Sequence, residues 1–349
     1  MIFSFFGFST RKLEICMLVL LVTYGGTYAQ FSDSLTRKEK GYIQEMTKYL
    51  SLRFAASNDL EAFSVDAGEF NPKIYPNTAT TLKLGVSYRF LAFSLNFAPS
   101  FLPGNDDDEL KGKTKNFGLS LGFIHPHWFT SLGYSRHKGY YLQNTSDFLP
   151  DWKNGDLYIQ FPNMKVSIFE GLTGYNFNRR YSVLALTTQA ERQLRSAGTF
   201  AAVAGYRLYF VNNLTDVSGQ KSQNFEVTLG VGYHFTWVLK QTFYTSIGLT
   251  PSVGYIFTKL TTRGQQGVTD DIITNSKALI VRGDIRLALG YNSERFFTGI
   301  HFDMRDSVFE QEGTTAINTD MHFFYQVFIG YRMNAPSSVR KTLEKIPLN

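Results

Sequence analysis

A strict two-residue period of apolar side chains runs from Phe225 to Trp237. Seven apolar residues in that stretch alternate with six residues that are polar or glycine. This alternation is typical of a β-strand with one apolar and one polar face. The strand would be about 13 residues long, whereas strands of globular proteins average five or six and a tilted membrane-crossing strand needs about 9–11. The length favours a strand that crosses a membrane.

The same pattern recurs in stretches that begin near residues 82, 93, 117, 128, 200, 243, 285, 300 and 323. The chain has 32 Phe, 20 Tyr and 3 Trp, and aromatic residues gather at the ends of the apolar faces, while the opposite faces carry Gly, Ser, Thr and charge. A soluble β-sandwich is the alternative, but aromatic girdles and long strands are typical of transmembrane barrels. We predict an all-β fold, an antiparallel β-barrel of the outer-membrane type.

The number and sidedness of the strands follow from the connections. Twelve strands are expected from Thr81 onward, and an additional pair at 50–56 and 60–65 would give fourteen; both numbers are even, as in bacterial single-chain barrels. Short and long connections alternate, but the two halves of the chain are out of phase by one crossing. Either 187–198 hides a turn, or the connection at 211–223 lies on the short-turn side.

The N-terminus resembles a secretory signal peptide. Arg11 and Lys12 precede an apolar run at 15–22, and small residues end at Ala29. We expect a signal peptide at 1–29, a periplasmic segment at 30–48, the barrel at 49–333 and a basic periplasmic tail at 334–349. The single cysteine, Cys16, lies in the leader, so the mature chain would carry no disulfide. The expected location is the outer membrane of a Gram-negative bacterium.

Several short motifs also resemble a known family. They are Tyr75-Pro76-Asn77-Thr78, Gly112-Lys113-Thr114-Lys115, Lys138-Gly139-Tyr140-Tyr141, Gln193 followed by Ser196-Ala197-Gly198, and Gly232-Tyr233. In this order they are similar to an uncharacterised family of bacterial outer-membrane proteins, domain of unknown function 4421, over roughly residues 50–332. The resemblance implies a Bacteroidota-type outer-membrane barrel and supplies no activity.

Polar side chains on the predicted inner faces are the candidate lumen or ligand-facing residues. They are Glu226, His234, Arg282, Asp284, Arg286, His301, Asp303, Arg305, His322 and Gln326. A tight turn at 292–295 would set Arg286 opposite His301, with Arg286 diagonal to Asp303. Asp284 would then oppose Asp303 and lie diagonal to Arg305. Such a cluster is either a structural ion-pair ladder or a selectivity ring, and its local charge of +1 predicts a weak preference for anions.

Evidence for catalysis is weak. No zinc-protease helix motif, phosphate-binding glycine loop or dinucleotide fingerprint is present. Ser135 and His137 could form a nucleophile and base, but they share the face opposite Trp128 and would point inward, away from lipid. We predict no catalytic residue, with Ser135 and His137 as the runner-up pair. No metal or cofactor is predicted, because the acidic run at 106–109 lacks the spacing of a calcium loop.

The sequence therefore predicts a non-enzymatic outer-membrane barrel that acts as a narrow pore, a transport-associated barrel or a structural surface protein. A lipid-modifying hydrolase is one alternative, and a scaffold for a secretion or transport partner is another. Outer-membrane lipids, lipopolysaccharide and the barrel-assembly machinery are the expected partners, and nucleic acid is not. A periplasmic partner remains open, because the polar segment at 30–48 and the basic tail would both lie in the periplasm.

Overall fold

The computed structural model describes residues 41–58, 63–64, 72–124, 127–213, 219–264, 270–310, 317–337 and 339–340. The predicted signal peptide at 1–29 lies outside these residues, as do most of the strand expected at 60–65 and the tail beyond 340. Residues 38–335 form one compact unit, to which all the described strands belong.

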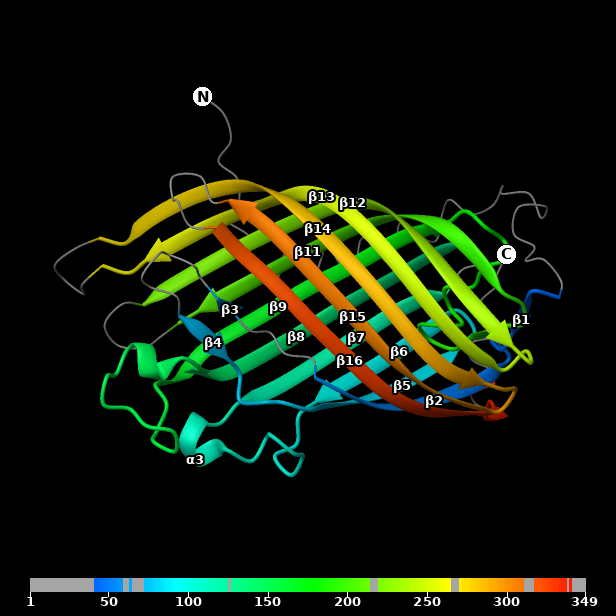
Figure 1. Ribbon diagram of the computed structural model, residues 1–349, viewed down its shortest axis with the longest axis horizontal. Helices are drawn as coiled ribbons and strands as arrows, with labels where there is room; N and C mark the ends of the chain where they lie inside the picture. The colour runs from blue at the N-terminus through cyan, green and yellow to red at the C-terminus, as the bar shows by residue number, and fades with distance from the viewer. Residues whose placement is uncertain are drawn as a thin grey trace. The chain divides into compact units, whose positions relative to one another are not determined.

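Twelve antiparallel strands of that unit close into a barrel (Figure 1). They are β2 (Tyr49–Ser57), β5 (Thr81–Tyr88), β6 (Leu91–Phe97), β7 (Lys115–Ile124), β8 (Trp128–Leu142), β9 (Gln160–Asn176), β11 (Ala197–Asn212), β12 (Gln220–Leu239), β13 (Phe243–Thr262), β14 (Ile272–Asn292), β15 (Phe296–Glu310) and β16 (Ile317–Asn334). Each strand pairs with its barrel neighbours in sequence, and the pairing of β2 with β16 closes the ring. The predicted all-β barrel is confirmed.

The remaining elements are short. β3 (Phe63–Ser64) pairs with β4 (Lys73–Tyr75), and β4 pairs in turn with the end of β8. β1 (Ile43–Glu45) and β10 (Glu191–Gln193) form a separate two-stranded sheet. The helical turns α3 (Asp108–Lys111) and η1 (Thr145–Asp147) lie in the long connections. Among the described residues, no helix is both long and apolar enough to cross a bilayer.

The expected total of twelve strands is correct, but its membership differs. β2 belongs to the barrel, so only eleven barrel strands follow Thr80. The fourteen-strand alternative is wrong, because β3 lies beside β4 at the end of β8 rather than in the ring. The chain after Thr80 supplies one barrel strand fewer than expected because residues 177–196 form a single connection between β9 and β11 and add no strand to the barrel wall.

This connection also resolves the phase of the loops. Residues 89–90, 125–127, 240–242 and 293–295 join strands at one end, which we call the short-turn end. Since 177–196 returns to that same end, the alternation holds along the whole chain. The alternative that placed the 211–223 connection there is wrong, because β11 meets β12 at the end that carries the other long connections.

Strand register separates a lipid-type exterior from the lumen. On β12 the side chains of Leu229 and Val231 are 64% and 58% exposed, whereas Thr228, which precedes Leu229, is 5% exposed. On one side of these residues Phe225 of β12 stacks on Phe257 of β13, and on the other side Tyr233 of β12 contacts Phe200 of β11. The predicted outward and inward faces are therefore confirmed on this wall. Its apolar belt lies between aromatic side chains, as transmembrane barrels require.

Candidate functional site

Residues 177–196, which we call the plug, fold back into the lumen at the short-turn end. Tyr181 and Leu186 of the plug are buried against Tyr244 of β13 and Ala288 of β14. Leu184 is buried beside Ala92 of β6. In the ring order β6 lies opposite β13, so the plug contacts facing walls and spans the lumen.

Two arginines from the strands that close the barrel hold the plug. Arg53 of β2 donates from Nη1 to the carbonyl oxygen of Thr187 at 2.9 Å. Arg332 of β16 is fully buried and donates from Nε and Nη2 to the carbonyl oxygen of Gln189, at 3.2 and 2.5 Å. Buried cations of this kind require hydrogen-bond partners, and plug carbonyls supply them.

Polar side chains within the plug explain why this segment folds inward rather than forming a strand. The Ser182 hydroxyl donates to the Glu191 carboxylate at 2.5 Å, and the Ser182 amide donates to the side chain of Gln193 at 2.8 Å. Arg192 donates to the carbonyl oxygen of Asn292, at the end of β14, and to that of Gln241, in the short turn at 240–242. These bonds satisfy buried polar groups that would otherwise oppose burial.

Burial also changes the acidity of two plug side chains. It raises the pKa of the Tyr181 phenol, against which hydrogen bonds from Thr236 and Ser246 act in the opposite direction. Burial lowers the pKa of the Arg192 guanidinium, which nevertheless remains a cation at neutral pH. Under ordinary conditions the Tyr181 phenol is therefore neutral and the Arg192 side chain is positively charged.

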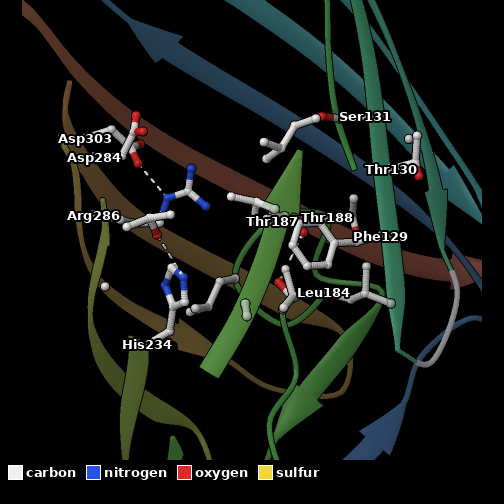
Figure 2. A pocket seen from close by; sticks show the side chains of 18 of the residues that line it. Phe129, Thr130, Ser131, Leu184, Thr187, Thr188, His234, Asp284, Arg286 and Asp303 are labelled. Atoms are coloured by element: carbon white, nitrogen blue, oxygen red, sulfur yellow. Dashed lines mark hydrogen bonds and ion pairs between the residues drawn. The ribbon is translucent and has the colours of Figure 1, made fainter. Parts of the chain in front are cut away.

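A cavity of about 440 Å³ lies in the lumen beside the plug. Leu184, Thr187 and Thr188 of the plug line it together with Phe129 of β8 and Arg286 of β14, as Figure 2 shows. The volume falls in the range of about 300–1,000 Å³ that small-molecule sites occupy. The candidate functional site is this cavity together with the plug.

Two ion pairs line one wall of the cavity. Arg286 Nε lies 2.5 Å from Asp303 Oδ1, and Arg305 Nε lies 2.9 Å from Asp284 Oδ1. Both contacts were expected, but as diagonal ones. The strand register places Arg286 directly opposite Asp303, and Asp284 opposite Arg305, so the expected register was wrong by two residues. The difference arises at the tight turn at 293–295, which sets Asn292 opposite Phe297 and so fixes the register of the two strands.

The other predicted lumen residues lie at different depths. Glu226 pairs with Arg282 at 2.5 Å, which cancels the surplus positive charge expected for the cluster. The His234 ring contributes to the cavity and lies 3.3 Å from the Thr250 hydroxyl. His301 packs on Phe328, away from the cavity lining, and Gln326 accepts a hydrogen bond from Arg53 at 2.6 Å. The side chain of His322 lies outside the described residues.

The plug and the cavity occupy two successive layers of the lumen. A third layer lies beyond the cavity, toward the long connections. There the inward side chains are apolar and buried. They include Met164, Val166 and Ile168 of β9 with Ile256 and Ile280 of β13 and β14. Because they are covered, these side chains pack together rather than line a wide aqueous channel. The lumen thus changes along its axis from plug to polar cavity to apolar layer.

Ser135 and His137 lie on the inward face of β8, opposite Ile168 and Val166 of β9. His137 is 3% exposed, and neither residue belongs to the cavity lining. In the part of the chain that the structure describes, no group of three or more His, Cys, Asp or Glu side chains could hold a metal ion. The chemistry that the site offers is hydrogen bonding and charge pairing.

The comparisons with known proteins add the family. Residues 33–333 match the sequence pattern of Domain of unknown function (DUF4421). The chain belongs to the DUF4421 family. No curated protein matches it in sequence.

Among solved structures, the proteins to which the chain is similar include three with the following values. The β domain of the Bordetella autotransporter BrkA has 11% identity and a TM-score of 0.33, with 82% of this chain and 99% of that chain covered. OmpT, an outer membrane protein of Vibrio cholerae, has 11% identity and a TM-score of 0.28, with 83% of this chain and 99% of that chain covered. The translocator domain of the autotransporter NalP from Neisseria meningitidis has 6% identity and a TM-score of 0.27, with 92% of this chain and 96% of that chain covered. Values this low assign no function.

In this DUF4421 protein, three of the motifs that carry the family resemblance meet at the long-connection end. The Asn77 amide donates to the Thr114 hydroxyl at 2.8 Å, which donates in turn to the carbonyl oxygen of Gly139 at 2.7 Å. Gly139 has a φ of +93°, and a Cβ there would overlap the carbonyl oxygen of Lys113. The motifs therefore tie two long connections to the end of β8, whereas Gln193 and Ser196 belong to the plug and Ala197-Gly198 begin β11.

Several residues of the site were missed from the sequence. Arg53, Glu170, Arg207 and Arg332 all project inward, and each could have been found because it alternates with outward apolar neighbours. Phe129 also faces the lumen, although aromatic side chains usually mark the exterior. The plug was signalled only indirectly, by the mismatch in loop phase.

Proposed function

We propose that this protein resides in the outer membrane of a Gram-negative bacterium and acts as a plugged, transport-associated conduit rather than as an enzyme. The exposed apolar belt supports the membrane location, because such a surface is stable only against lipid or another apolar surface. The short-turn end, with the plug and β1, then faces the periplasm, as short turns do in such barrels. Lipids and lipopolysaccharide contact the outer face.

One observation carries the proposal: the plug contacts opposite walls of the barrel. Leu184 packs beside Ala92 on β6, while Leu186 packs with Tyr244 on β13. Hydrogen bonds from Arg53 and Arg332, on the two strands that close the ring, also fix the plug to the barrel wall. Passage through such a lumen requires the plug to move, and its pairing with β1 gives a periplasmic partner access to it.

The inward position of Ser135 and His137 supports a non-enzymatic protein over a lipid-modifying hydrolase. A lipid substrate lies outside the barrel, whereas both side chains project into the lumen and His137 is buried. A nucleophile and its base must also reach the substrate in hydrogen-bonding geometry. The lumen position does not provide this for a lipid.

Planar-bilayer conductance tests the proposal. The refolded mature protein should show low conductance, and a variant with residues 183–189 replaced by Gly and Ser should conduct strongly. An equal-length replacement at 151–157, in a long connection at the opposite end, is the matched control and should leave conductance low. Wide-open conductance of the native barrel, or a plug variant that remains closed, would contradict the plugged conduit. Recovery in the inner-membrane fraction would contradict the location.

A further inference from the structure

We propose that the lumen cavity binds a neutral, hydroxyl-rich ligand of one or two rings, such as a mono- or disaccharide. The inference rests on the proposed function, since it names what a plugged conduit would hold between its plug and its apolar layer. Three features of the cavity carry it: the charge balance of the lining, the accessibility of its ion pairs and an apolar wall that faces them.

The charges around the cavity balance. Three arginines and three carboxylates contribute to the lining: Arg207, Arg286, Arg305, Glu170, Asp284 and Asp303. A net anion or cation therefore gains no overall Coulomb attraction from this set. A hydroxyl group is suited to it, because one hydroxyl can donate to a carboxylate and accept from a guanidinium.

The ion pairs are accessible from the cavity. The side chains of Arg286 and Arg305 are 42% and 41% exposed, although both lie inside the barrel. Each pair is made through Nε and Oδ1, so it does not itself occupy the Nη groups or the second carboxylate oxygen. Ligand hydroxyls can use these atoms while the pairs remain intact. A zwitterion would have to compete with the pairs themselves.

An apolar wall lies across the lumen from the ion pairs. Leu172 of β9 projects inward yet is 37% exposed, and it lies beside Val203 and Phe129 in the lining. The Phe129 ring covers Gly174, where a Cβ would overlap it. In the ring order of twelve strands, β8 lies opposite β15, and β9 lies five places from β15. A sugar ring matches both walls, because its C–H face is apolar and its edge carries hydroxyls.

Isothermal titration calorimetry of the refolded mature protein in detergent tests the ligand class. The probes are glucose and maltose, with glucosamine, glucuronate and glycine betaine as cationic, anionic and zwitterionic comparisons. We expect saturable binding of a neutral sugar at least about ten-fold tighter than of any charged probe, a difference of about 1.4 kcal/mol. Preference for a charged or zwitterionic probe, or binding of none of them, would overturn the proposal.

Phe129→Ala should weaken sugar binding by about ten-fold or more, and Leu132→Ala, on the outward face of the same strand, is the matched control. If Phe129→Ala does not refold, Phe129→Leu keeps the apolar volume without the flat ring and carries the same expectation. The two proposals fail separately. Loss of sugar binding with a conducting plug variant removes the ligand assignment alone, while sugar binding with a closed plug variant removes the conduit alone.

Discussion

Arg332 and Gln189 lie 143 positions apart in the sequence, and both are fully buried where the Arg332 guanidinium donates twice to the Gln189 carbonyl oxygen. The same guanidinium lies 4.7 Å over the ring of Phe297 and donates to the Asn292 side chain. One side chain of the last strand thus joins the barrel wall to the plug.

Arg332→Met should destabilise the protein by about 1–3 kcal/mol, because the Gln189 carbonyl loses its buried donors. It should also raise conductance, since the plug loses an anchor. Chemical denaturation in micelles measures the first effect and planar bilayers the second. Arg295→Met, at an exposed turn position, is the control and should change stability by less than about 0.5 kcal/mol. Equal effects of the two substitutions would rule out Arg332 as an anchor.

Leu229→Arg should destabilise the membrane-inserted protein by about 2–4 kcal/mol, because the charge would face the hydrocarbon near the bilayer midplane. Ser131→Arg should be tolerated far better, since Ser131 faces the cavity. Folding titrations into lipid vesicles compare the two variants. Equal tolerance at both positions would contradict the outward assignment of Leu229.

Arg286→Met should cost more stability than the double variant Arg286→Met, Asp303→Leu, because the single change leaves one charge unpaired in the lumen. A double-mutant cycle should give a coupling energy of about 0.5–3 kcal/mol. The Lys111–Asp107 pair on and beside α3, in the connection between β6 and β7, is the comparison, with about 0–1 kcal/mol expected. A coupling energy of zero between Arg286 and Asp303 would show that their ion pair does not contribute to stability.

Stability should fall as pH rises above about 10, the ordinary pKa of tyrosine, because burial raises the pKa of Tyr181 in the folded state. The unfolded chain then loses its phenolic proton first, so deprotonation favours unfolding over the interval between the two pKa values. Denaturation midpoints between pH 8 and 11 measure the slope. Tyr181→Phe should flatten it, and an unchanged slope would assign it to other tyrosines.

The barrel was predictable because its signal is local. The alternation of Leu229 and Val231 with Thr228 depends only on the two-residue period of a strand that has lipid on one side and the lumen on the other. Inward charges such as Asp284 and Arg286 follow from the same parity. Their contacts with Arg305 and Asp303 were also predictable, although the register was not, because a turn of a few residues permits several pairings.

The plug could not be predicted in the same way. Its apolar residues, such as Leu184 and Leu186, read equally well as part of a strand, and its position depends on bonds from distant residues such as Arg53 and Arg332. The cavity is a further step removed, because its size depends on how far the plug enters the lumen. Sequence therefore indicates which side chains are inside, and only the assembled barrel determines which of them meet.

The closure of the ring by β2 and β16 has a consequence for how the molecule assembles. Arg53 and Arg332 lie on these two strands, the first and last of the barrel, and each hydrogen-bonds the plug. Until the seam closes, these two arginines do not lie on neighbouring strands, and a chain truncated before its final strand lacks the Arg332 anchor altogether. Closing the barrel therefore strengthens the hold on the plug, and we expect the lumen to be blocked most firmly only in the completed barrel.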